Sequence, residues 1–250
     1  MGAVAFQKRG TPVARTGSPM SLFLNRTREV RWTEDERRAL AEAVAEDRAD
    51  AWRGVGALDR TVVVSTEDPG VRGGARWPTD HRAFLRVDRG ASVVLATDGL
   101  SDPFDRLAHP GTGLGLELCL ETSAVRGVPT AELWNHWHFR LLYEAARRAA
   151  LQGVCCRSSL DTARLANVAA PPAWTDEQGA VGVLLGLRSP GLPERLDLAT
   201  GHADLVTLTP LRPQEHARAS VDAGARAEIA ERLRALPHEE LVHTARPLVV

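Results

Sequence analysis

The stretch GTGLGLELCLET, residues 111–122, limits the possible fold more than any other part of the sequence. Its three glycines at every second position are compatible with a phosphate-binding loop or with the entry to a β-strand. A dinucleotide-binding loop follows a strand and opens a helix, because the phosphate lies at the helix N-terminus. Here the order is different, since the residues that follow the glycines have the period of a strand.

The alternation from residue 114 to residue 121 is strict. One face carries Leu114, Leu116, Leu118 and Leu120, and the other carries Gly115, Glu117, Cys119 and Glu121. The glycines therefore predict the start of a strand. Because Gly113 and Gly115 have no side chain, we also expect another backbone or element to approach closely at this point.

Other segments predict a mixture of helices and strands. Thr33 and Glu36 form a capping-box pattern ahead of a helix that reaches Asp50. The clearest helical period covers residues 131–152, with Trp134 and Trp137 expected in the core. Further predictions are strands at 61–65, 91–97, 180–187 and 204–211, a helix at 223–236 and a last short strand at 246–250.

These elements indicate the fold class and the domain organisation. Clustered strands between outlying helices, without strict βαβ alternation, predict an α+β fold with a mixed β-sheet flanked by helices. Residues 1–28 hold five basic side chains, no acid and no helical or strand period, which predicts a flexible basic tail. No repeat and no convincing linker divides residues 29–250, so we expect a single domain there.

Composition narrows the function classes. The formal net charge is −1, which makes a nucleic-acid partner unlikely by electrostatics, and no apolar run approaches the length of a membrane span. Three cysteines without a CxxC pattern, and a start without a secretory signal, predict a cytoplasmic protein with no disulfide framework. The histidines form no ligand motif, because His136 and His138 would point to opposite sides of a helix. We therefore expect no metal and no cofactor.

The segment ATDGLSDPFD, residues 96–105, is locally acidic and directly follows a predicted strand. Its aspartates are compatible with turn capping through side-chain bonds to backbone amides. Alternatively, Asp98, Ser101, Asp102 and Asp105 form an acidic patch that binds a basic partner. A hydrolase built from Ser101, Asp102 and a distant His109 is a further alternative, although GLSDP is not a G-x-S-x-G elbow.

Two of the six tryptophans lie in sequence typical of loops. Trp77 is in GARWPTDHR, and Trp174 is in PPAWTDEQ. Tryptophan is frequent at binding hot spots, so both are candidates for a contact surface, with packing of the loops onto the body of the domain as the alternative.

Four motifs in order carry a family resemblance. TDGLSD, GTGLGLELCLET, VGVLLGL and DLVTLTPLRPQE together resemble the suppressor-of-fused (SUFU) domain family over residues 61–250. Family strands often carry aromatic residues where Leu114, Leu116 and Leu120 stand here. The second domain with which animal members help to clamp a transcription factor has no counterpart in this sequence, so that activity is not implied. Bacterial stand-alone members are associated with polymorphic toxin systems as immunity proteins.

The resemblance implies a non-enzymatic protein-binding domain that sequesters or neutralises a protein partner, such as a toxin domain. The candidate contact residues are those of the acidic segment together with Trp77 and Trp174. Two alternatives stay open: a cytoplasmic hydrolase-type enzyme with a pocket near Ser101, and a structural or regulatory module of a larger assembly.

Overall fold

The computed structural model describes residues 32–59, 61, 63–64, 77–104, 111–152, 160–237, 241–243 and 245–250. The chain divides into two compact units, Met1–Val30 and Arg31–Val250, and the fold described below is that of the second unit. The predicted basic tail, residues 1–28, and the candidate residue Asp105 lie outside the described residues.

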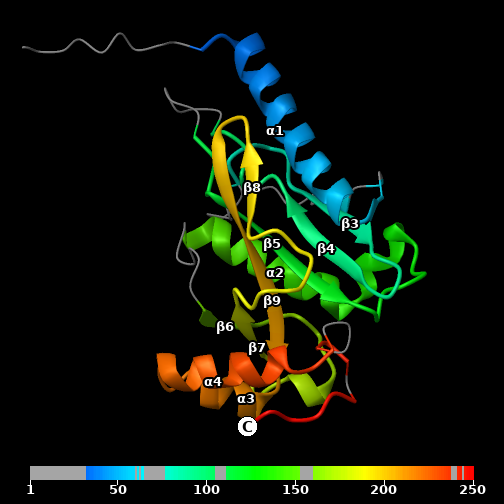
Figure 1. The fold of residues 1–250 in the computed structure, drawn as a ribbon, viewed down its shortest axis with the longest axis vertical. Coiled ribbons are helices and arrows are strands. Elements are labelled where there is room, and N and C mark those ends of the chain that lie inside the picture. The colour runs from blue at the N-terminus through cyan, green and yellow to red at the C-terminus, as the bar shows by residue number, and fades with distance from the viewer. Residues whose placement is uncertain are drawn as a thin grey trace, which may run out of the picture. The chain divides into compact units, whose positions relative to one another are not determined.

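The second unit contains both helices and strands (Figure 1). The strands are β1 (Ala57–Leu58), β2 (Val63–Val64), β3 (Ala83–Asp88), β4 (Val93–Asp98), β5 (Leu116–Thr122), β6 (Asp161–Leu165), β7 (Val181–Leu185), β8 (Arg195–Leu198) and β9 (Gly201–Leu211). The α-helices are α1 (Glu34–Val55), α2 (Trp137–Gln152), α3 (Pro213–Ala219) and α4 (Ala223–Arg234), and two short 3-10 helices are η1 (Thr130–Asn135) and η2 (Pro172–Trp174).

The strands form one mixed sheet in the order β1-β3-β4-β5-β9-β7-β6, with β2 also paired to β3 and β8 to β9. Among the described strands, β5 and β9 run parallel and all other neighbours are antiparallel. The long strand β9 joins the parts of the sheet, because it pairs in turn with β8, β5 and β7 along its length. The predicted α+β class with a mixed sheet and flanking helices is confirmed.

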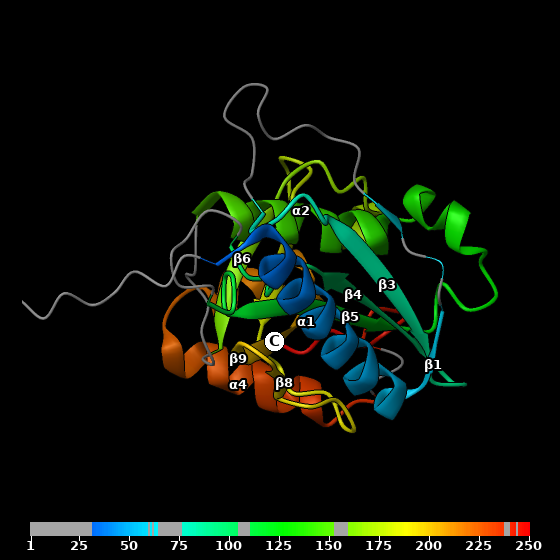
Figure 2. The same cartoon turned by 90° about the horizontal axis from the view of Figure 1, so that it is seen from above.

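Helices α1 and α2 cover opposite faces of the β3–β4–β5 part of the sheet (Figure 2). Leu116, Leu118 and Leu120 pack in the core cluster that contains Phe139 and the other buried residues of α2. Cys119, from the opposite face of β5, packs with Trp52 of α1. Both faces of β5 are therefore buried. Because the side chains alternate along the strand, the leucines face α2, and Glu117, Cys119 and Glu121 lie on the face toward α1.

The glycine-rich stretch is the entry to a strand, as predicted. β5 begins at Leu116, directly after the glycines. A Cβ atom at Gly113 would lie 2.3 Å from the backbone oxygen of Asp102 and 2.6 Å from that of Leu100. Gly113 also has a positive φ of 47°. The expected close approach of another backbone is thus observed at Gly113, and only glycine fits there without strain.

Several boundaries differ from the prediction. The capping box of Thr33 and Glu36 is present, but α1 runs on to Val55. The segment predicted as one helix from residue 131 is the 3-10 helix η1 followed by α2, which breaks the helical phase at His136. Trp134 is consequently 40% exposed and not in the core. Residues 246–250 form no strand, and the prediction missed β1, β3, β6, β8, α3 and η2.

None of the helices in the described part of the chain is both long enough and apolar enough to span a bilayer.

Candidate functional site

A buried arginine lies beneath the predicted acidic segment. Arg48 belongs to the stripe of α1 that also buries Val44 and Trp52, and its side chain is fully buried. Its Nε donates to Asp98 Oδ1 at 2.7 Å, and its Nη1 lies 2.6 Å from Asp102 Oδ1. These two aspartates come from the end of β4 and the turn that follows it, so the ion pairs join α1 to the sheet.

Glu117 completes this cluster from β5. Its Oε1 lies 3.9 Å from Arg48 Nε, and it accepts hydrogen bonds from the Ser101 hydroxyl at 2.6 Å and the Ser101 backbone amide at 2.9 Å. The Thr97 hydroxyl donates to its other oxygen. Burial raises the pKa of Glu117 above its usual range, although the charge of Arg48 opposes this effect. We define the Arg48 cluster as Arg48, Asp98, Ser101, Asp102 and Glu117.

His81 lies at the edge of the Arg48 cluster that is open to solvent. Its Nε2 is 3.1 Å from Asp98 Oδ2, and its side chain is 44% exposed. The hydrogen bond with Asp98 raises the pKa of His81. For Asp98, burial favours the neutral form, but His81 and Arg48 outweigh it and hold its pKa below the usual value.

The segment that carries Trp77 and His81 packs tightly over the turn that contains Asp98. A Cβ at Gly99 would lie 2.3 Å from the backbone oxygen of His81, and Gly99 has a positive φ of 131°. Thr79 donates from its hydroxyl to Asp102 Oδ2 at 2.9 Å. Two loops that are distant in sequence are therefore held together at one end of the sheet by backbone contact and by hydrogen bonds.

The carboxylates of the acidic segment are turned inward in the described structure. Ser101 is fully buried, Asp102 is 4% exposed and Asp98 keeps a 17% exposed side chain. The expectation that Asp98, Ser101 and Asp102 form an exposed acidic patch is therefore wrong for Ser101 and Asp102, because Arg48 of the same chain neutralises the patch from below. Whether Asp98 contacts a partner stays a prediction.

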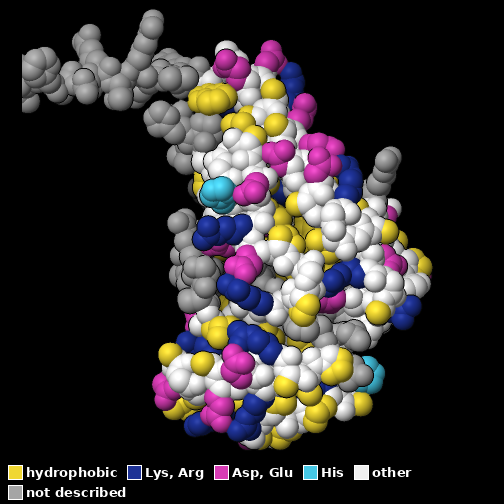
Figure 3. Space-filling model, in the orientation of Figure 1, with side chains coloured by type: hydrophobic (Ala, Val, Ile, Leu, Met, Phe, Trp, Pro, Cys, Tyr) yellow, Lys and Arg dark blue, Asp and Glu magenta, His cyan; other side chains and the backbone are white. Residues whose placement is uncertain are grey.

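The exposed acids lie instead on the outward face of α1. Figure 3 shows Asp and Glu side chains along this helix. The exposed carboxylates of α1 are Glu34, Asp35, Glu36, Glu42, Glu46 and Asp50. We define these six residues as the acidic face of α1. Arg38 pairs there with Asp35, and Arg53 pairs with Glu46 and Asp50.

The two candidate tryptophans have different environments. Trp77 is partly buried and meets Phe84 edge to face with ring centroids 5.8 Å apart. Trp174 is fully buried, and the guanidinium carbons of Arg246 and Arg212 lie 5.2 and 5.9 Å from its ring centroid. Trp174 is thus part of the interior and cannot be a surface contact in this structure, whereas Trp77 keeps an accessible part.

The aromatic packing around Phe84 brings a different tryptophan to the surface. Phe84 meets Phe139, and Phe139 meets the exposed Trp134 at 5.4 Å. Trp134 also meets Tyr143 at 4.9 Å. The helical spacing did not predict this exposure, because the segment is a 3-10 helix as far as Asn135 and an α-helix only from Trp137.

The geometry around Ser101 differs from that of a hydrolase. Its buried hydroxyl donates to Glu117 and accepts from Arg48 Nη1 at 3.2 Å. Within the described residues, no histidine ring is hydrogen-bonded to Ser101, and His109 lies outside them. No group of three or more His, Cys, Asp or Glu side chains in the described ranges is arranged to hold a metal ion.

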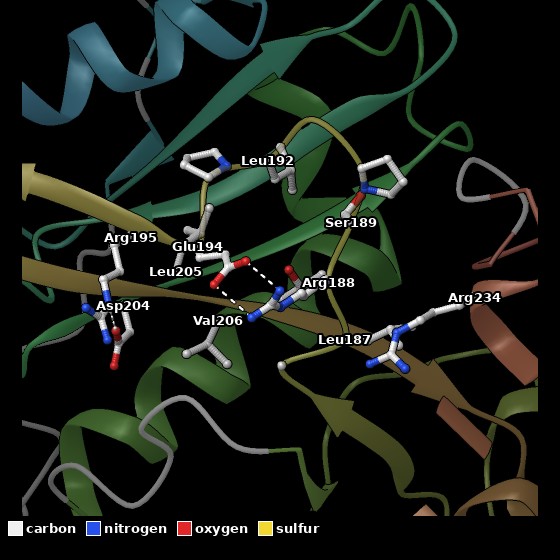
Figure 4. Close-up of a pocket in the computed structure, with 14 residues that line it drawn as sticks. Leu187, Arg188, Ser189, Leu192, Glu194, Arg195, Asp204, Leu205, Val206 and Arg234 are labelled. Carbon is white, nitrogen blue, oxygen red and sulfur yellow. Dashed lines mark hydrogen bonds and ion pairs between the residues drawn. The ribbon is translucent and has the colours of Figure 1, made fainter. Parts of the chain in front are cut away.

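A cleft of about 450 Å³ lies elsewhere, between the β7–β8 loop and β9. Figure 4 shows apolar side chains that line it, among them Leu187, Leu192 and Leu205, and the charged side chains around it. Arg188 forms an ion pair with Glu194 and Arg195 with Asp204, while Arg234 reaches the cleft from α4. The sequence did not predict this cleft, because its residues come from three separate segments: the β7–β8 loop, β9 and α4.

Comparison by sequence finds no protein-family model and no curated protein that matches the chain. Comparison of folds finds similar solved structures. One is the crystal structure of the Sufu–Fu complex, with a TM-score of 0.51 and 16% identity, covering 78% of this chain and 84% of the matched chain.

A second is the crystal structure of Drosophila suppressor of fused, also with a TM-score of 0.51. Its identity is 15%, and the match covers 84% of this chain but 48% of that chain, so the present chain spans about half of the Drosophila protein. At these identities the likeness concerns the fold. The described domain has a suppressor-of-fused-like fold.

Proposed function

We propose that this chain is a non-enzymatic protein-binding domain that sequesters or neutralises a protein partner, as the immunity protein of a bacterial polymorphic toxin system. The observation that carries the proposal is the fold. The matched structure of Sufu was determined in complex with Fu, so one protein with this fold binds another protein. The proposed place of action is the cytoplasm, in keeping with the free, buried thiol of Cys119.

The proposed contact surface is the acidic face of α1 together with the accessible parts of Asp98 and Trp77. Exposed carboxylates attract a basic surface and speed the encounter, while a partly exposed tryptophan supplies apolar contact area. A toxin that acts on nucleic acid has such a basic surface, and covering it would be sufficient to neutralise the toxin. In this proposal Ser101 and Asp102 shape the site from below, and Asp105 stays a candidate outside the described residues.

The test is rescue of growth. The protein encoded beside this chain in its native genome is expressed alone and together with this chain, and the complex is then purified through a tag on this chain. We expect growth inhibition by the neighbour alone, rescue on co-expression and recovery of one stoichiometric complex. Failure to rescue, together with failure to recover any specific protein from the native host at low salt, would overturn the proposal.

A charge-reversal variant tests the acidic face of α1. Glu42→Lys with Glu46→Lys reverses two exposed charges of α1, and Glu177→Lys reverses an exposed charge in the turn after η2. We expect the α1 variant to associate with the partner more slowly than wild type at low salt, and this difference in association rate to disappear at high salt. Glu177→Lys should associate at the wild-type rate. Equal association by all three proteins would remove α1 from the proposed surface. Asp98 and Asp102 are unsuitable for this purpose because they pair with Arg48.

A further inference from the structure

Hydrogen bonds within the chain hold in place the β7–β8 loop that bounds the cleft beside β9. At one end of the β7–β8 loop the backbone amide of Gly186 donates to Thr207, and at the other end the amide of Leu205 donates to Glu194, both at 2.9 Å. The middle of the loop is fixed as well, because the Ser189 hydroxyl donates to the buried Glu121 of β5.

Arg89 strengthens this anchor from the β3–β4 turn. It donates to Glu121 at 2.8 Å and to the backbone oxygen of Pro190 at 3.0 Å. The loop is therefore tied to β9 at both ends and to β5 through Glu121 in its middle. A cleft bounded in this way exists before any ligand arrives, so binding would not require the loop to become ordered.

The polar groups around the cleft are unbalanced toward hydrogen-bond donors. Glu194 accepts from Arg188 Nη1 and Nη2 at 2.7 and 2.9 Å, and Asp204 accepts from Arg195 Nε at 3.2 Å. The acids that line the cleft are thus already engaged, whereas each guanidinium has five N–H donors. Arg234 adds a third guanidinium, whose ion pair is with Glu231 of its own helix.

The floor of the cleft is apolar. Leu187 and Leu205 line it, and Leu192 stands in the loop above them. The side chain of Val206 points to the other face of β9, into the core that α2 covers. A ligand that complements this arrangement brings an apolar side chain for the floor and hydrogen-bond acceptors, best of all carboxylates, for the guanidinium groups. A basic segment would find the carboxylates that line the cleft, Glu194 and Asp204, already engaged by Arg188 and Arg195.

We propose that this cleft binds a short segment of the protein partner in which an apolar residue is flanked by Asp or Glu. The carboxylates contact Arg195 and Arg234, and the apolar side chain rests on Leu192 and Leu205. The inference rests on the proposed protein-binding function and adds a second contact, of opposite charge preference to the acidic face of α1. A volume of about 450 Å³ is within the range of sites that hold a few residues or a small molecule.

The test needs no knowledge of the partner. The probe is the synthetic peptide acetyl-Gly-Ser-Glu-Leu-Glu-Ser-Gly-amide, titrated into the isotope-labelled full chain and followed by backbone amide NMR. We expect saturable shifts at Leu187, Leu205 and Thr207, with a dissociation constant of about 1 mM or tighter. The matched peptides carry Gln in place of Glu, or Gly in place of Leu, and each should bind at least about fivefold more weakly.

Variants locate the binding. Arg195→Gln and Arg234→Gln should each weaken binding of the acidic peptide about fivefold or more. Arg53→Gln should not, because Arg53 is an arginine of α1 outside the cleft, with an exposure between those of Arg195 and Arg234 and with its own carboxylate partners. Unchanged amide spectra away from the cleft would verify that the variants are folded. The absence of shifts at the cleft, or equal binding of the Glu and Gln peptides, would overturn the inference.

The outcome is separable from that of the proposed function. If this chain rescues growth and the partner binds the Arg195→Gln and Arg234→Gln variants as tightly as wild type, the cleft inference fails and the protein-binding function stands. If no partner is found but the peptide titration succeeds, the cleft has a carboxylate-bearing ligand and the immunity function fails.

Discussion

Arg48 is a charged residue at a position where the helical pattern requires an apolar one. It lies four residues after Val44 and four before Trp52, and all three are fully buried. An arginine in such a stripe indicates buried carboxylate partners, because an unpaired buried charge is too costly. This signal was present in the sequence, but the partners Asp98, Asp102 and Glu117 could not be found from it, since they come from other elements.

Replacing Arg48 tests how far the cluster depends on it. Arg48→Met keeps most of the side-chain volume but leaves three buried carboxylates without their cation. We expect the free energy of unfolding at neutral pH to fall by about 3–5 kcal/mol in urea denaturation. The loss should shrink in acid, as Asp98 and Glu117 become protonated.

The control is Arg53→Met on the same helix, where the ion pairs with Glu46 and Asp50 are exposed. Its urea midpoint should be close to that of wild type. Similar midpoints for both variants would contradict a supporting role for Arg48.

The contact between His81 and Asp98 makes the stability of the fold depend on pH. Because Asp98 raises the pKa of His81 in the folded state, protonated His81 stabilises the fold below the usual pKa near 6.5. That contribution is lost as pH rises through the raised pKa. The difference in unfolding free energy between wild type and His81→Gln should therefore be larger at about pH 5.5 than at about pH 8.5.

Asp98 has the opposite dependence and serves as the internal check. Its pKa is lowered, so its contribution is present above its usual value near 3.9 and is lost as pH falls through the lowered one. Urea midpoints across both ranges measure the two effects separately. A His81→Gln difference that grows as pH rises would show that the imidazole is not paired with Asp98 in solution.

At the scale of elements, β5 and its entry were the most predictable part of the chain. Period-2 alternation identified the strand, and Gly113 identified the close backbone contact. The helix at residues 131–152 was less predictable, because Pro129 and Thr130 open a 3-10 helix whose end at His136 changes the direction of the side chains. The short strand β6 carries no clear pattern of its own, and pairing with β7 defines it. The strand β8 alternates between exposed and buried residues, but it has only four residues, and its pairing with β9 completes it.

The two glycines at the start of the motif provide a matched pair. Gly113→Ala would place a Cβ against two backbone oxygens at positive φ, so we expect a loss of about 1–3 kcal/mol or more of unfolding free energy. Gly111→Ala meets no atom within 4 Å and should be tolerated. Thermal unfolding of both variants is the measurement. Equal melting temperatures would mean that the turn at Leu100–Asp102 can move away from Gly113.

At the scale of the whole molecule, the placement of the tryptophans shows what sequence alone could not decide. Trp174 lies in loop-like sequence yet is fully buried, while Trp134 has helical spacing yet is exposed. Burial of Trp174 depends on Arg246, which is distant in the sequence and stacks on its ring. The same holds at the candidate site. The sequence singled out Asp98 and Asp102, but the direction of their side chains depends on Arg48, which lies in the first helix.

Arg246 also links the C-terminal segment to the rest of the domain through an ion pair and hydrogen bonds. It is paired with the equally buried Glu215 at 2.6 Å and donates to the backbone oxygen of Leu241, while the amide of Val249 donates to Glu215. Removing either charge leaves the other buried alone, so Arg246→Met and Glu215→Leu should each cost about 3–5 kcal/mol of unfolding free energy.

The double variant distinguishes a buried pair from two independent contacts. With both charges replaced by apolar groups, neither is left unpaired, so the combined loss should be well below the sum of the single losses. Urea denaturation measures the three free energies. Hydrogen exchange at the amide of residue 246, which donates to the backbone oxygen of His243 in every variant, reports whether the C-terminal segment stays in place. Additive losses with early exchange at residue 246 in every variant would mean that the segment is held through the backbone contacts of Arg246 and not through its charge.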